Sequence, residues 1–397
     1  MLRDSIRKAL LVIALAAFAL ASLGAAPPTN SSGPASSAPD RILVKFKAGT
    51  DANTAAAIHR QNGGTVVGTV RGLGVQAIAV PAGTSASKIA SYYRNPNVQY
   101  AESDHIASAV GKPAPAPVTP AVSDTYFSKQ WGMTKVQAPD AWTVTKGNSA
   151  IKIAILDTGI DQNHADLSSK IVAQSNFTDS ATVDDLYGHG THVAGIAAAI
   201  TDNEIGVAGL GFNSSLMNGK VLDDSGSGYY SWIANGVMWA ADNGAKVINM
   251  SLGGTYSDIT LAAAVNSAWT NGAVIVAAAG NNGNSVPFYP AAYDNAIAVA
   301  ATDSKDNRAS FSNFGSWVDV AAPGVNIYST YNDGAYTYMS GTSMASPHVA
   351  GLAALVWAKY GTDNADVRAR IESGTDRLKN ANIAAHGRIN AYKAVKN

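Results

Sequence analysis

Between about residues 124 and 397, short and nearly continuous apolar runs alternate with longer stretches in which apolar residues recur every three or four positions. The runs IKIAIL, KVINMSL, AVIVAAA and AIAVAAT predict strands that are buried on both faces. The stretches GTHVAGIAAAI, YYSWIANGVMWAADNG and TLAAAVNSAWTNG predict helices. This alternation predicts an α/β fold of three layers, in which helices cover both faces of a mostly parallel central sheet.

Residues 40–110 follow a different pattern. Four strand-like pieces, RILVKFKAG, TVVGTV, VQAIAVPAG and VQYAESD, accompany two helical patterns, DANTAAAIHRQNG and SASKIASYYRNP. We expect a small α+β domain here. Segments rich in proline, serine and alanine at 27–39 and 111–123 predict linkers, so the larger domain is expected at 124–397.

The N-terminus carries a targeting pattern. Three basic residues among the first eight precede an uncharged apolar run at 9–24, and small residues follow it. This order is typical of a secretory signal peptide, and the run is slightly short for a membrane span. We therefore expect a signal peptide at 1–26, contact with the membrane only during export, and an extracellular protein. An uncleaved membrane anchor is the alternative.

Composition narrows the chemistry. Lys+Arg and Asp+Glu both number 28, and the zero net charge argues against nucleic acid as a partner. The absence of cysteine excludes disulfides, thiolate zinc sites and a cysteine nucleophile. The composition leaves the oligomeric state open, and a monomer is the default expectation.

Three candidate catalytic residues fall at the ends of predicted elements. Asp157 ends the strand IKIAIL, His189 begins a helix, and Ser343 begins the last long helix. In doubly wound sheets such ends gather at the carboxyl edge of the strands. A serine at a helix start is usually only a cap, but serine, histidine and a carboxylate together suit nucleophilic catalysis. Asn281, after the strand AVIVAAA, suits an oxyanion donor.

The order of these residues along the chain is Asp, His, Ser, unlike that of α/β-hydrolases or chymotrypsin-like enzymes. The motifs ILDTGI, GHGTHVAG, INMSLGG, AAAGNNG and GTSMASPHVAG resemble, in sequence order, those of subtilisin-like serine proteases, nearest to the thermitase branch. Residues 40–110 resemble the inhibitory propeptide of that family. The resemblance implies a secreted serine endopeptidase of broad specificity that is made as a self-processing zymogen.

The same resemblance implies roles for individual residues. Ser343 becomes the nucleophile that forms an acyl-enzyme, His189 the base, Asp157 the acid that orients the base, and Asn281 an oxyanion donor. The propeptide becomes an intramolecular inhibitor and folding aid, and polypeptides become the substrates. The residues implied to bind substrate are Ser251, Leu252 and Gly253 along its backbone, Ala278 and Gly280 on the wall of the primary pocket, and Phe288 at its base. Because relatives have a smaller or polar residue at the Phe288 position, we expect a shallow pocket.

Calcium is the cofactor that the resemblance implies. Calcium prefers carboxylate, amide and carbonyl oxygens. The first implied site combines the side chains of Asp124, Asp166 and Asn203 with the carbonyls of Ile200, Ile205 and Val207. A second site would use Asp179 and Asp184, in a loop that matches the family less completely.

Two other functions stay open from the sequence. One is a catalytically silent binding or scaffold protein on the same fold. The other is a protease that remains tethered to the membrane by its N-terminal segment.

Overall fold

The computed structural model describes residues 37–109, 122–379 and 382–396. The predicted signal peptide and most of both predicted linkers lie outside these residues. Residues 37–39, expected in the first linker, already belong to strand β1 (Ser37–Phe46). In the described part of the chain, no helix is both long and apolar enough to cross a bilayer.

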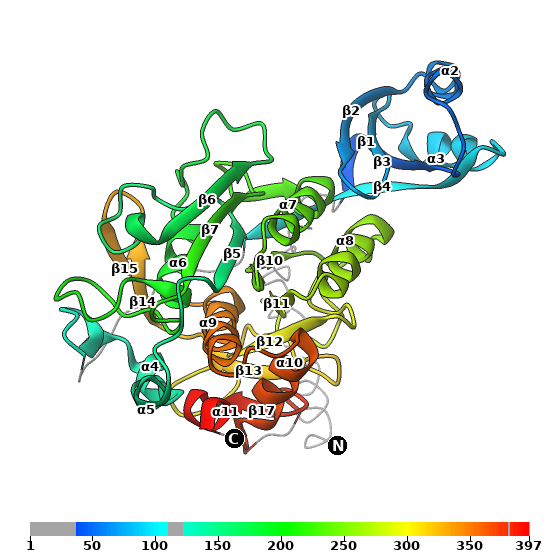
Figure 1. Cartoon of the computed structure of the whole chain (residues 1–397). Coiled ribbons are helices and arrows are strands. Elements are labelled where there is room, and N and C mark those ends of the chain that lie inside the picture. The colour runs from blue at the N-terminus through cyan, green and yellow to red at the C-terminus, as the bar shows by residue number, and fades with distance from the viewer. Residues whose placement is uncertain (1–36, 110–121, 380–381, 397) are drawn as a thin grey trace, which may run out of the picture. The chain divides into compact units, whose positions relative to one another are not determined.

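The larger domain is built on a sheet that has nine strands in the described residues (Figure 1). All of its pairings are parallel except the one between β16 and β17 at one edge. The parallel α/β prediction is therefore confirmed. In spatial order the strands are β16 (Thr375–Asp376), β17 (Gly387–Ile389), β13 (Val320–Pro323), β12 (Ala296–Thr302), β11 (Val274–Ala278), β9 (Val247–Met250), β5 (Lys152–Asp157), β7 (Ser215–Lys220) and β6 (Ile171–Asn176).

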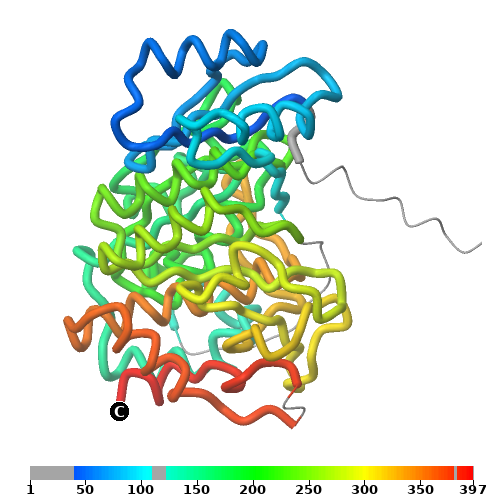
Figure 2. Tube along the Cα trace, turned by 90° about the vertical axis from the view of Figure 1, so that its right-hand side faces the viewer, coloured from blue at the N-terminus to red at the C-terminus, as the bar shows by residue number. Residues whose placement is uncertain are grey.

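Helices cover both faces of this sheet, as the apolar runs predict. Alternate residues of β5 enter different cores: Ile153 and Ile155 pack on one side, Ala154 and Leu156 on the other. The first core includes α5 (Ala138–Val144), α6 (His189–Ala198), α9 (Thr342–Tyr360), α10 (Asn364–Ser373) and α11 (Ala391–Lys396). The second includes α7 (Tyr230–Asp242) and α8 (Ile259–Thr270), which lie side by side in Figures 1 and 2.

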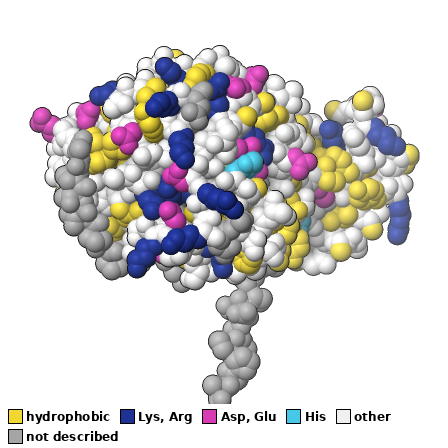
Figure 3. All heavy atoms as spheres, turned by 90° about the horizontal axis from the view of Figure 1, so that it is seen from below, with side chains coloured by type: hydrophobic (Ala, Val, Ile, Leu, Met, Phe, Trp, Pro, Cys, Tyr) yellow, Lys and Arg dark blue, Asp and Glu magenta, His cyan; other side chains and the backbone are white. Residues whose placement is uncertain are grey.

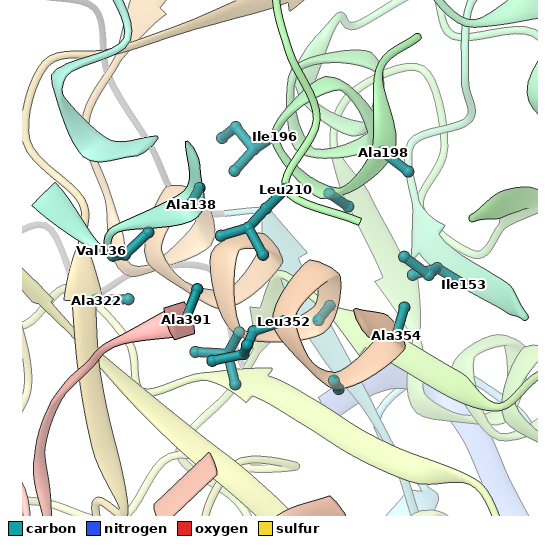
Figure 4. Close-up of a cluster of buried hydrophobic side chains, with 14 of the residues drawn as sticks. Val136, Ala138, Ile153, Ile196, Ala198, Leu210, Ala322, Leu352, Ala354 and Ala391 are labelled. Atoms are coloured by element: carbon teal, nitrogen blue, oxygen red, sulfur yellow. The ribbon is translucent and has the colours of Figure 1, made fainter. Parts of the chain in front are cut away.

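Helix α9 lies at the centre of the first core. Every residue from Thr342 to Trp357 is buried, which explains why its sequence is apolar on all sides. Figure 4 shows Leu352 and Ala354 of this helix among side chains of the neighbouring elements. A Cβ on Gly351 would lie 2.7 Å from the carbonyl oxygen of Ala197, so only glycine allows α9 to approach α6 this closely.

Smaller elements complete the larger domain. The antiparallel pair β14 and β15 packs against α6. The bounds are β14 (Ile327–Tyr331), β15 (Ala335–Met339), α4 (Trp131–Lys135) and the short 3₁₀ helices η1 (Phe127–Lys129) and η2 (Ser168–Lys170).

The small N-terminal domain has the α+β composition that its pattern predicts. Its strands pair in the order β4, β1, β3, β2, and every pairing is antiparallel. It has its own core around Ile42, Ile78 and Tyr92. The elements are β1, α2 (Ala52–Asn62), β2 (Thr65–Val70), β3 (Val75–Ala79), α3 (Ser85–Tyr93) and β4 (Val98–Ala109).

Strand β4 extends further than predicted and joins the two domains. Its last residues pair with β8 (Ser227–Tyr229) on one side and with β10 (Leu252–Gly253) on the other. Ala107 lies opposite Gly228, and Ala109 lies opposite Leu252. The end of the small domain is thus the middle strand between two strands of the large one.

Charged side chains of both signs are interspersed on the face drawn in Figure 3. This mixture agrees with the zero net charge of the chain.

Candidate active site

The carboxyl end of β5 brings the first two candidate residues together. Asp157 is completely buried, and its Oδ1 lies 2.7 Å from Nδ1 of His189, the first residue of α6. A carboxylate can only accept, so Nδ1 carries the proton. In the neutral imidazole this leaves Nε2 as the basic nitrogen.

Close packing fixes the geometry of this pair. The backbone N–H of Thr158 also donates to Asp157 Oδ1, at 2.8 Å. A Cβ on Gly190 would lie 2.1 Å from the carbonyl oxygen of Gly159, so the start of α6 rests directly on the loop after β5. The glycine after His189 is therefore required by the approach of two backbones.

Ser343 is the second residue of α9 and is buried. Its Oγ donates to the carbonyl oxygen of Ser251 at 2.9 Å, and the Ser251 Oγ donates to the Ser343 carbonyl at 2.8 Å. Pro347 explains why that carbonyl is available. Proline has no N–H to donate to the carbonyl four residues earlier, which here is that of Ser343. Pro347 is the sixth residue of the helix, beyond its first turn.

Asn281 lies in the loop after β11, next to the start of α9. Its Oδ1 accepts from the backbone N–H of Thr342 at 3.0 Å and from the Thr342 hydroxyl at 2.9 Å. Because a backbone N–H can only donate, these bonds fix the amide orientation. The Asn281 NH₂ group is therefore the part that can donate to another group.

The residues expected to bind substrate surround this position. Ser251 separates β9 from β10, and Gly253 in β10 is already paired with Ser108 of the small domain. The ring of Phe288 is buried against two glycines. A Cβ on Gly253 would lie 2.5 Å from Phe288 Cε1, and one on Gly280 would lie 2.9 Å from Phe288 Cγ. Phe288 thus fills the space between β10 and the loop after β11, where Ala278 ends its strand.

The residues expected at the first calcium site also gather. Asp124 and Asp166 are buried, and Oδ1 of Asp124 has no hydrogen-bond partner among the described residues. Burial raises the pKa of both carboxyls, that of Asp166 to about 6. Asn203 donates from Nδ2 to Asp166 Oδ1 at 2.8 Å, while its own Oδ1 accepts from the N–H of Ile205. Asp166 Oδ2 accepts from the N–H of Val207, and Ile200 donates its N–H to the Asp166 carbonyl.

This donor set fits a hard cation with one adjustment. The carboxylates of Asp124 and Asp166 are both buried, and one Asp124 oxygen has no hydrogen-bond partner among the described residues. Such a pair favours a bound cation, because burying negative charge without a counter-charge is costly. Asn203, however, turns its nitrogen toward Asp166, so it would have to rotate to act as a ligand. No group of three His, Cys, Asp or Glu side chains with metal-binding geometry exists among the described residues.

The second predicted calcium site has less support. Asp179 is exposed. Oδ1 of Asp184 accepts from the backbone N–H groups of Gln162 and Asp185, both at 3.1 Å.

Asp185, the next residue, is not among the site residues that the sequence predicts. Its acidic loop sequence favours a solvated side chain, but Asp185 is only 3% exposed and accepts five hydrogen bonds. Its position four residues before His189 was the only signal in the sequence.

A parallel sheet that carries Asp, His and Ser at its carboxyl edge is typical of a serine hydrolase. The order Asp, His, Ser along the chain differs from that of the α/β-hydrolases. Comparison with known proteins gives the family. The subtilase family model matches residues 148–386, and the fervidolysin N-terminal prodomain model matches residues 25–104.

Three relatives show how far the similarity extends. Thermitase of Thermoactinomyces vulgaris is 53% identical over 277 residues, which are 69% of this chain and 99% of that protein. A thermophilic serine proteinase of Bacillus sp. (strain AK1) is 44% identical over 89% of this chain and 86% of its own length. Subtilisin E of Bacillus subtilis (strain 168) is 42% identical over 76% of this chain and 77% of its own length. The chain belongs to the subtilase family, in its thermitase branch, and is a serine protease with an N-terminal prodomain.

Proposed function

We propose that the protein is a secreted endopeptidase of broad specificity that cleaves peptide bonds through Asp157, His189 and Ser343. The observation that carries the proposal is the buried 2.7 Å contact between Asp157 and His189 Nδ1. It holds the imidazole with Nε2 as the base for the Ser343 hydroxyl. Ser343 Oγ attacks the carbonyl carbon, the leaving amine takes the proton from His189, and water then hydrolyses the acyl-enzyme.

Asn281 supplies the oxyanion donor in this proposal. Its NH₂ group is held by the two bonds from Thr342 to its oxygen. A donor fixed in advance stabilises the tetrahedral intermediate without reorganisation, and such a donor contributes roughly 2.7–4 kcal/mol. The backbone N–H of Ser343 is the second donor.

The substrate backbone is proposed to pair with Ser251, Leu252 and Gly253 by strand addition. The Ser251 carbonyl now accepts from Ser343 Oγ. A substrate N–H that takes this acceptor would release the hydroxyl toward His189. Substrate binding and activation of the nucleophile would then be coupled through one carbonyl oxygen.

Phe288 is proposed to restrict the residue before the cleaved bond, P1, to small side chains. Its ring occupies the space between Gly253 and Gly280. The segment of β4 that pairs with β8 and β10 ends in Ala107, Ser108 and Ala109, which are all small. Such a sequence suits a shallow primary pocket.

The prodomain is proposed to act as an intramolecular inhibitor and folding aid. Its β4 takes the position between β8 and β10 that an extended substrate would take. Two carboxylates of β4 also cap helices. Glu102 accepts from Ile259 N, Thr260 N and Thr260 Oγ1 at the start of α8. Asp104 accepts from Ser231 N and Oγ at the start of α7.

These caps supply a physical reason for a folding role. Anionic groups at helix N-termini stabilise the helices, and a sheet with many non-local parallel pairings folds slowly. The prodomain would help to bring α7 and α8 together before the sheet is complete.

Calcium is proposed to stabilise the mature fold at Asp124, Asp166 and Asn203, with the carbonyls of Ile200, Ile205 and Val207. A cation there would offset the cost of two buried carboxylates. Occupancy at Asp179 and Asp184 is proposed only as a weaker second site. Export through a signal peptide at 1–26, domains bounded at 40–110 and 124–397, and a monomeric enzyme complete the proposal.

The test compares the purified wild-type chain with Ser343→Ala. The wild type is expected to hydrolyse casein, to react with a fluorophosphonate probe and to lose its N-terminal domain. The variant is expected to stay at full length and to be inert. A folded wild-type chain that neither reacts with the probe nor cuts casein would contradict the proposal.

A further inference from the structure

Asp185 lies in the loop that leads into α6, four residues before His189. Its side chain is buried and accepts five hydrogen bonds. Oδ1 accepts from the hydroxyl of Thr158 at 2.9 Å and from the N–H groups of Tyr187 and Gly188 at 3.0 and 2.8 Å. Oδ2 accepts from the N–H and the hydroxyl of Thr191 at 2.8 and 2.7 Å.

These donors come from both sides of the Asp157–His189 pair. Thr158 directly follows Asp157, and its N–H is bound to the Asp157 carboxylate. The Thr158 hydroxyl also accepts from the N–H of Gly190, the residue after His189. Asp185 and Thr158 therefore tie the loop after β5 to the first turn of α6.

A second connection runs through Thr191. Its hydroxyl donates to Asp185 and accepts from the N–H of Asp161 at 2.9 Å. On the other side of the loop, the buried Lys220 donates to the Thr158 carbonyl at 2.5 Å. The segment from Thr158 to Asp161 is thus bound at several points. Two of these bonds lead to Asp185, one directly from the Thr158 hydroxyl and one from the Asp161 N–H through Thr191.

The negative charge of Asp185 is stabilised by the dipoles of backbone N–H groups and hydroxyls. None of the ion pairs among the described residues involves it. Three backbone N–H groups at the start of α6 and two hydroxyls take the place of a counter-ion. The carboxylate therefore adds a fixed negative charge close to the start of the helix that carries His189.

We propose that Asp185 is a positioning residue of the active site, which fixes His189 against Asp157 and whose charge favours the imidazolium that forms during catalysis. The inference rests on the proposed function of His189 as the base. A displacement of about 1 Å in such a pair can lower the rate by roughly a hundredfold. Positive charge that develops on His189 is stabilised by a nearby anion.

Other charged or titratable groups also contribute to the electrostatic environment of His189. They are Asp157 on β5, Lys220 on β7 with its partner Asp224, His192 on α6, and Tyr331 on β14, whose hydroxyl donates to the Tyr187 carbonyl. Burial lowers the pKa of His192 to about 3, so this neighbour stays neutral through the working range.

The test compares Asp185→Asn and Thr158→Val with wild type, each expressed as the full chain and allowed to mature. Active sites are counted with a fluorophosphonate, so that kcat refers to folded enzyme. Asparagine replaces one acceptor oxygen by an NH₂ group that faces the donors of Thr191. We expect Asp185→Asn to lower kcat roughly tenfold or more, with KM changed less than twofold. The acid limb of its kcat/KM profile should move to lower pH, because a negative charge is lost.

Thr158→Val separates position from charge. It removes the hydroxyl link but keeps the Asp185 carboxylate, so kcat should fall while the acid limb stays in place. If Asp185→Asn does not fold, Thr158→Val alone still tests whether the hydrogen bond between Thr158 and Asp185 positions His189. Asp303→Asn is the matched control, because Asp303 accepts three hydrogen bonds within its own loop at 2.9 to 3.0 Å. Its kcat should stay within twofold of wild type.

Two results would overturn the inference. One is a kcat per titrated site within twofold of wild type in both variants, with any loss explained by fewer active sites. The other is an equal fall in kcat for Asp303→Asn. In either case the wild type still reacts with the probe, whereas a wild type that does not react would instead refute the proposed function.

Discussion

At the scale of single residues, the candidate site depends on groups whose partners are backbone atoms. Thr342 holds Asn281, Ser251 and Ser343 exchange hydrogen bonds, and Pro347 frees the carbonyl that Ser251 uses. Buried polar groups need such partners, since an unsatisfied one costs about 1–3 kcal/mol. Asn281, Ser251 and Ser343 consequently have hydrogen-bond partners in the absence of substrate.

Phe288 gives the prediction at this scale. Phe288→Ala removes the ring that lies against Gly253 and Gly280, and so deepens the proposed primary pocket. The ratio of kcat/KM for a peptide with Phe at P1 to one with Ala at P1 should rise roughly tenfold or more. Val286→Ala, in the same loop but 50% exposed, is the control and should leave the ratio unchanged. An unchanged ratio in Phe288→Ala would show that the ring does not limit P1.

At the scale of elements, helix α9 contributes both to the candidate site and to the packed core. Its first turn carries Ser343, and its remaining turns form the centre of a core. His348 lies in the part of α9 that forms the core. It is buried, its Nδ1 lies 2.8 Å from the Met344 carbonyl, and burial lowers its pKa to about 4. The neutral imidazole is thus part of the packed helix.

This burial predicts acid sensitivity. In the unfolded chain a histidine titrates near pH 6.5, so between about pH 6.5 and 4 the unfolded state binds more protons than the folded state. Stability should therefore fall as the pH falls through this window, by up to about 1.4 kcal/mol per pH unit for each such histidine. Urea unfolding of Ser343→Ala, which cannot digest itself, should show this loss. Adding His348→Gln should flatten the curve, and parallel curves would refute the assignment.

The strand β4 gives a second prediction at this scale. Glu102→Gln replaces an anion that accepts three hydrogen bonds at the start of α8. The released prodomain should dissociate sooner, so the lag between cleavage and full activity should shorten. Asp51→Asn is the control, because Asp51 caps α2 within the prodomain and asparagine is an equally good cap. The proposed docking would be wrong if both variants showed the wild-type lag.

At the scale of the whole molecule, a chain without cysteine must obtain its stability without disulfide bonds. The two cores on either side of the sheet supply the packing. Asp124 and Asp166 are a local cost in the absence of a cation, because both are buried carboxylates with raised pKa values. A bound ion would turn this cost into stabilisation.

Removal of calcium tests this point. A cation at a hundred times its Kd stabilises by about 2.7 kcal/mol, which corresponds to roughly 5–10 °C in Tm for a domain of this size. EDTA should lower the Tm of the Ser343→Ala chain by such an amount, and added calcium should restore it. Asp166→Asn should lower Tm and abolish the response, while Asp303→Asn should keep it. A Tm that is insensitive to EDTA would exclude a stabilising ion.

The sequence by itself determined the fold class, the family and the presence of an N-terminal prodomain, and it predicted which elements carry Asp157, His189 and Ser343. Apolar runs such as IKIAIL are typical of strands that are buried on both faces in a covered parallel sheet. Such a sheet gathers the element ends that carry Asp157, His189 and Ser343 at one edge. The linear pattern carries these features because each strand and helix shows its burial in its own local run of apolar residues.

Tertiary structure alone decided the contacts between segments far apart in the sequence. Asp185 is an exposed acidic residue by its local pattern, yet the approach of α6 to the loop after β5 buries it. The reach of β4 between β8 and β10, and the packing of Phe288 against Gly253 and Gly280, likewise depend on how separate elements pack. Hydrogen bonds and close contacts of this kind have no periodicity, so they emerge only when the chain is folded.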